Sequence, residues 1–218
     1  MEIIKAELTV KTHNEVCLTP VAELPITEVV RRIEKVNSQL AEFWSKSDGW
    51  APVAAAGLLG KSRLDWQVSL SGSLRLWIRD PADALTPAEL ILAWANLGSL
   101  IEGATKLFLS AYYETFKADI DNLKKVNAYN NKKQEPLSPD GLTLEPLRQY
   151  CALRQILNKD DLALVQRVQQ RRNAIHAFKN RPIGDDAEFQ QSIRGYLQML
   201  RNVIARLPYP GEEYVPVE

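Results

Sequence analysis

Residues Thr86-Pro87-Ala88-Glu89 form the clearest helix start in this sequence. They combine a hydroxyl that can cap a helix, a proline suited to the first turn and a carboxylate three residues after the threonine. Apolar residues follow at three- and four-residue steps, which predicts one long helix that extends to about Leu123. These apolar residues are Leu90, Trp94, Leu97, Ile101, Leu107, Phe108, Ala111, Tyr112 and Phe116.

The same periodicity predicts four further helices, over about residues 26–46, 51–78, 160–179 and 186–206. Short helical pieces are expected between residues 144 and 158. Residues 124–143 are polar and rich in Asn, Lys and Pro, so we expect a long loop there. The sequence therefore predicts a mainly α fold, a bundle of about five helices over residues 26–206.

The two ends of the chain lack helical periodicity. Apolar and polar residues alternate from residue 2 to residue 12, which is typical of a half-buried strand, and residues 16–19 could form the returning strand. Because a lone hairpin is marginally stable in water, we expect residues 1–25 to contain a strand pair packed on the bundle. Residues 207–218 contain three prolines and are expected to form an extended tail.

Composition restricts the class of protein. The chain has 218 residues with 27 Lys and Arg against 27 Asp and Glu, so it has no overall basic field that would attract nucleic acid. It has no run of about 18 apolar residues that could span a membrane and no apolar leader at its start. The two cysteines lie far apart in sequence, as expected for free thiols. We therefore expect a cytoplasmic protein with no membrane partner.

Several other patterns have ordinary structural interpretations. Residues 55–62 resemble a phosphate loop ending in Gly60-Lys61-Ser62, but no buried strand precedes them, as that motif requires. Cys17, Cys151, His13 and His176 fall on separate elements without ligand spacing, so we expect no metal and no cofactor. The five tryptophans are interpreted as core residues. Glu102 and Lys106 are four residues apart and are expected to pair on one helix face.

The most promising chemistry lies in the Arg-His motif, Arg171-Arg172-Asn173-Ala174-Ile175-His176. On a helix, Arg172 lies about 40° from His176 and Asn173 joins the same face, whereas Arg171 lies about 140° away. A histidine can transfer protons near neutral pH, and an arginine can stabilise the charge that develops on a phosphate during cleavage. The alternative interpretation is a surface cluster of cations near the end of a helix, paired with acidic side chains.

The Arg-His motif resembles that of the HEPN domains found in prokaryotic defence and toxin systems. Their signature is an arginine, often followed by a polar residue such as asparagine, and then a histidine, with four to six residues between the arginine and the histidine. Arg171 has this spacing to His176, whereas Arg172-Asn173 has the arginine-polar step but only three intervening residues. Which of the two arginines has the family role stays open at this point.

The resemblance implies a homodimer with a composite cleft, metal-independent endoribonuclease activity on an RNA substrate, and a role as a toxin or antiphage defence effector. His176 would be the acid/base, Arg171 or Arg172 the phosphate ligand, and Asn173 the orienting group. An antitoxin or another protein of the defence system would be a further partner. The alternative is a non-catalytic helical module that binds a partner protein, a nucleotide or RNA, because some members of the family lack activity.

Overall fold

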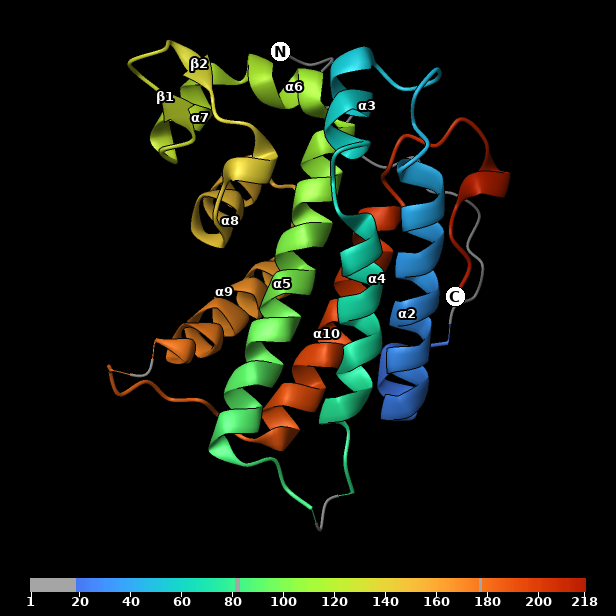
Figure 1. Ribbon diagram of the computed structural model, residues 1–218, viewed down its shortest axis with the longest axis vertical. Coiled ribbons are helices and arrows are strands. Elements are labelled where there is room, and N and C mark those ends of the chain that lie inside the picture. The colour runs from blue at the N-terminus through green and yellow to red at the C-terminus, as the bar shows by residue number, and fades with distance from the viewer. Residues whose placement is uncertain (1–18, 81–82, 177) are drawn as a thin grey trace.

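The computed structural model describes residues 19–80, 83–176 and 178–218, and within these ranges the protein is mainly helical (Figure 1). The described residues form nine α-helices rather than about five. They are α2 (Ile26–Trp44), α3 (Val53–Leu59), α4 (Leu64–Ser73), α5 (Pro87–Ala111), α6 (Tyr113–Ala118), α7 (Ile120–Lys125), α8 (Leu144–Leu153), α9 (Lys159–Arg172) and α10 (Asp186–Ile204). The mainly α class is confirmed, and the predicted number of helices is wrong.

Helix α5 is the central element of the fold. Thr86 caps it and exchanges hydrogen bonds with Glu89, as the sequence predicts. Helices α4 and α10 run beside α5 along the long axis of the molecule, α2 packs on α4 and α10, and α9 packs against α5 at an inclined angle (Figure 1). Apolar side chains from all five helices form one continuous core, which includes Trp44 and Trp94.

Two predicted helices are each divided in the structure. The helix predicted over residues 51–78 ends at Leu59 and restarts at Leu64, because the Ser62 hydroxyl and amide both donate to the Leu59 carbonyl and close the first helix. The long helix ends at Ala111 rather than near Leu123. There, the Tyr112 hydroxyl donates to the carbonyl of Arg206, and the chain continues in two short helices, α6 from Tyr113 and α7 from Ile120.

The predicted polar loop at residues 124–143 contains more structure than expected. Strands β1 (Tyr129–Asn130) and β2 (Glu135–Pro136) pair antiparallel, with the Asn130 side chain accepting hydrogen bonds from the amides of Lys132 and Lys133 in the turn. The strand pair predicted within residues 1–25 falls largely outside the described residues. The tail, residues 207–218, lies along α2, where Gln39 pairs with the backbone of Val217.

Candidate functional site

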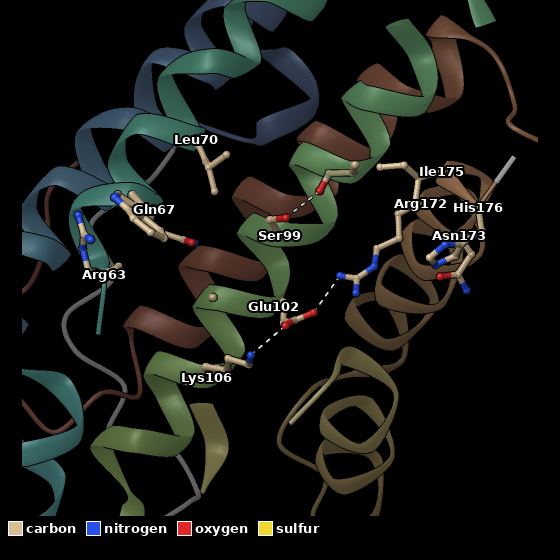
Figure 2. A pocket seen from close by; sticks show the side chains of 13 residues that line it. Arg63, Gln67, Leu70, Ser99, Glu102, Lys106, Arg172, Asn173, Ile175 and His176 are labelled. Carbon is tan, nitrogen blue, oxygen red and sulfur yellow. Dashed lines mark hydrogen bonds and ion pairs between the residues drawn. The ribbon is translucent and has the colours of Figure 1, made fainter. Parts of the chain in front are cut away.

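The Arg-His motif borders an open pocket of about 600 Å³, hereafter the α5 pocket. Helix α5 forms its floor, α4 forms one wall, and the end of α9 with the 3-10 turn η4 (Asn173–Ile175) forms the other wall (Figure 2). The lining residues are Arg63, Trp66, Gln67, Leu70, Ala95, Ser99, Glu102, Gly103, Lys106, Arg172, Asn173, Ile175 and His176.

Glycines on α5 allow the two walls to approach the floor closely. A methyl group on Gly103 would lie 2.2 Å from Oε1 of Gln67, a side chain of α4. A methyl group on Gly98 would lie 2.6 Å from Cδ of Arg172, the last residue of α9. The lack of a side chain at Gly98 and Gly103 therefore shapes the pocket as much as the side chains that line it do.

A chain of charges crosses the floor of the pocket. Arg172 donates to Oε2 of Glu102 at 2.9 Å, and Lys106 donates to Oε1 of the same carboxylate at 2.8 Å (Figure 2). The side chains of these three residues are 20–27% exposed, so solvent reaches both ion pairs. Because one carboxylate serves two cations and Arg63 also lines the pocket, the lining carries more positive than negative charge.

The two arginines of the motif have different environments. Arg172 lines the α5 pocket, whereas Arg171 is not among its lining residues. Arg171 donates to both carboxylate oxygens of Glu188 at 3.0 Å and to the carbonyl of Pro182 at 2.8 Å. Arg171 therefore ties the end of α9 to α10 and to the segment that precedes it.

His176 lies at the rim of the pocket, not on a regular helix. The sequence predicts a helix that continues to about residue 179, but α9 ends at Arg172, and the turn η4 leads to His176. This prediction is wrong because Arg171 binds Pro182 and Glu188, which fixes the returning chain beside the end of α9. The His176 side chain is exposed, and no residue of the described ranges forms a hydrogen bond or an ion pair with its imidazole.

The α4 wall contributes residues that the sequence analysis did not select. Trp66 is 58% exposed, although the sequence interpretation placed all five tryptophans in the core; only Trp44 and Trp94 are fully buried. The guanidinium of Arg63 lies 4.0 Å above the centre of the Trp66 ring. Arg63 also pairs with Asp65, whose pKa lies below its ordinary value because of hydrogen bonds from Arg63. The local pattern Arg63-x-Asp65-Trp66 is the sequence signal from which this part of the pocket could have been predicted.

The remaining sequence patterns lie outside the pocket. Gly60-Lys61-Ser62 follows helix α3, and hence it lacks the strand that a phosphate loop requires. Cys151 is fully buried in the core, as expected for a small apolar residue, and burial raises the pKa of its thiol to about 12. Within the described ranges, no three His, Cys, Asp or Glu side chains gather as metal ligands.

Comparison of the chain with protein-family models, curated proteins and solved structures found no match. None of the described helices combines the length and the apolar character needed to cross a membrane. The function of this protein therefore has to be argued from the α5 pocket itself.

Proposed function

We propose that this protein is a HEPN-type, metal-independent endoribonuclease that acts as a homodimer. The observation that carries the proposal is that Arg172, Asn173 and His176 line one open pocket with an excess of cations. An exposed imidazole and a guanidinium that border the same pocket are suited to cleaving RNA through its own 2′-hydroxyl. A role as a toxin or antiphage defence effector, with an antitoxin or defence-system partner, belongs to the same proposal.

In this mechanism the 2′-oxygen attacks the adjacent phosphorus and the bond to the 5′-oxygen breaks, which leaves a 2′,3′-cyclic phosphate. His176 of one copy removes the proton from the 2′-hydroxyl. His176 of the second copy, in its protonated form, gives a proton to the departing 5′-oxygen. A single copy lines this pocket with one described histidine, His176, so the proposal requires two copies arranged around a two-fold axis.

Arg172 is the better candidate for the phosphate ligand. Its guanidinium already reaches into the pocket, whereas Arg171 is engaged by Glu188 and Pro182. The Arg172–Glu102 pair is partly exposed, and pairs of this kind contribute only about 0–1 kcal/mol. A substrate phosphate can therefore replace Glu102 as the partner of Arg172.

The test is cleavage of a generic single-stranded RNA in the presence of EDTA. We expect His176→Ala to lower the rate by about 10²–10⁴-fold, the usual contribution of a general acid or base. Lys179→Ala is the matched control, because it removes a nearby exposed cation that is outside the pocket lining. The proposal fails if the parent does not cleave RNA, or if the parent and His176→Ala cleave it equally.

A second candidate is a non-catalytic helical module that binds a partner protein, a nucleotide or RNA. It is favoured by the fact that both arginines of the motif form ion pairs with glutamates, as structural residues would. Glu102→Gln distinguishes the two candidates. If Arg172 binds phosphate, the variant should cleave RNA at least as fast as the parent. If the pair is only structural, stability should fall while no cleavage is detected in either protein.

A further inference from the structure

The α4 wall of the pocket offers apolar and amide groups that the cleavage mechanism does not use. Trp66 is 58% exposed, far more than a tryptophan usually is, and Ile175 on the opposite wall is 49% exposed. Both side chains line the same pocket, together with Leu70. An exposed aromatic ring that borders a pocket suggests a surface for a flat ligand.

An ion pair lies against the ring of Trp66. Arg63 lies over it at 4.0 Å, and Asp65 in turn fixes Arg63 through two hydrogen bonds of 2.8 and 2.6 Å. No other aromatic ring of the described chain contacts Trp66. Because Arg63 covers one face of this exposed indole, the opposite face is the one that can act as a stacking platform for an unpaired base.

Gln67 adds a hydrogen-bonding group next to this platform. Its amide nitrogen donates to the Leu100 carbonyl at 2.7 Å and approaches the Tyr196 hydroxyl at 3.3 Å, which orients the side chain toward α5 (Figure 2). Its Oε1 accepts no hydrogen bond from a residue in the described ranges and lies above Gly103. This oxygen is available to an amino or imino group on the edge of a base.

The pocket thus changes character from one wall to the other. Trp66, Leu70 and Gln67 lie on the α4 side, and Arg172 and His176 lie on the other side. The floor between them contains the small residues Ala95, Ser99 and Gly103, and the charged pair Glu102 and Lys106 lies on the same helix. A nucleotide has the same order of groups, with a base, a ribose and a phosphate. We infer that Trp66, Gln67 and Arg63 form a binding site for one unstacked base of single-stranded RNA, next to the phosphate bound at Arg172.

This inference rests on the proposed function for its choice of RNA, but it makes a separate prediction about binding. A base within a duplex is stacked on both faces and cannot reach an indole, so the site selects single strands. Binding should be measured by the fluorescence anisotropy of a labelled single-stranded RNA of mixed sequence. The His176→Ala background prevents cleavage of the probe by the protein itself, and EDTA suppresses contaminating metal-dependent nucleases.

In that background, Trp66→Ala should weaken binding by about 5- to 150-fold, the equivalent of about 1–3 kcal/mol for one stacked base. Trp66→Phe retains an aromatic face and should bind within about threefold of the reference protein. The control is Val53→Ala, which removes an apolar side chain that is 91% exposed and outside the pocket. It should leave binding unchanged. A duplex of the same sequence should bind more weakly, with no dependence on Trp66.

The inference is overturned if Trp66→Ala binds the single strand as tightly as the reference protein, or if duplex binding falls equally. It is also overturned if the reference protein binds no RNA. His176-dependent cleavage combined with Trp66-independent binding would reject the base site and leave the ribonuclease proposal standing. Trp66-dependent binding without cleavage by the parent would reject the ribonuclease proposal and leave the base site standing.

Discussion

Two regions of the molecule use arginine–glutamate pairs in opposite ways. The first region, hereafter the tail clamp, consists of Glu218, Arg201 and Arg32. Glu218 accepts hydrogen bonds from Arg201 at 2.5 and 2.6 Å and from Arg32 at 3.0 Å, and its side chain is 7% exposed. In the α5 pocket, Glu102 joins Arg172 and Lys106 at similar distances but is 20% exposed. The ion pairs of the tail clamp are therefore enclosed by protein, whereas those of the α5 pocket border an open cavity.

The difference lies in what surrounds each carboxylate. The tail itself covers its clamp, because Gln39 holds the backbone of Val217 on both sides at 2.8 and 2.9 Å. Within the described part of the chain, no segment covers Glu102 in this way, and Glu102 lines a pocket of about 600 Å³. A buried pair resists separation because each partner would be left without compensation, whereas a partly exposed pair can exchange partners. The clamp is thus suited to stability and the pocket to binding an anion.

Among the substitutions that test this difference, Arg201→Ala should have the largest effect on the free energy of unfolding. Arg201→Ala leaves Glu218 without its two-pronged partner, and we expect the free energy of unfolding to fall by about 2–3 kcal/mol. Arg172→Ala, in the pocket, should lower it by less than about 1 kcal/mol. Urea denaturation followed by circular dichroism measures both. Equal losses in the two variants would mean that the pocket pair is as structural as the clamp.

The charged clusters were the part of the structure that the sequence predicted least well. The periodicity of α5 and its capping box were predictable because they depend on neighbours three and four residues away. The Glu102–Lys106 pair was predicted on the same basis. Its link to Arg172 was not, because those residues are 70 positions apart and meet only after α9 packs on α5.

The ends of helices were mispredicted for the same physical reason. The extension of α9 past residue 172 follows from periodicity, yet the contacts of Arg171 with Pro182 and Glu188 turn the chain back. Asn173 and His176 nevertheless line the pocket with Arg172, although they are not on the helix. Local sequence therefore predicted that Arg172, Asn173 and His176 share one side of the chain, but it predicted neither the separate environment of Arg171 nor the backbone that presents the other three, because tertiary contacts determine both.

The contribution of Glu218 to stability should depend on pH. Burial alone would raise the pKa of Glu218, but hydrogen bonds and charges from Arg201 and Arg32 together hold it below its ordinary value. A lowered pKa contributes stability above the ordinary glutamate pKa of about 4.3, and this contribution is lost as the pH falls through the lower pKa of the folded state. At pH 7 we expect Glu218→Gln to be less stable than the parent by about 1–2 kcal/mol.

Below pH 4.3 the difference between the two proteins should shrink, because the carboxyl group of the parent becomes protonated and resembles the amide. Denaturation midpoints measured between pH 7 and pH 3 check this expectation. A difference that stays constant over the whole range would show that the charge of Glu218 contributes nothing and that its shape alone holds the tail.

The smallest effects on stability are expected from two glycine-to-alanine substitutions, one away from the α5 pocket and one next to Arg172. Gly57 lies in the middle of α3, and a methyl group there would meet no atom within 4 Å. Gly57→Ala should therefore stabilise the protein by about 0.5–1 kcal/mol through helix propensity alone. Gly98→Ala gains the same helical preference, but its methyl group would lie 2.6 Å from Cδ of Arg172.

Because the Arg172 side chain is flexible, it can move away from the Gly98→Ala methyl group, and we expect the change in stability to lie within about 1 kcal/mol of zero. That movement displaces the guanidinium from Glu102 and from the pocket, so RNA affinity should fall in Gly98→Ala and remain unchanged in Gly57→Ala. Thermal melts and RNA titrations on the two variants provide the measurement. If Gly98→Ala binds RNA as well as Gly57→Ala does, the position of Arg172 in the pocket is irrelevant to binding, and the functional side of the comparison fails.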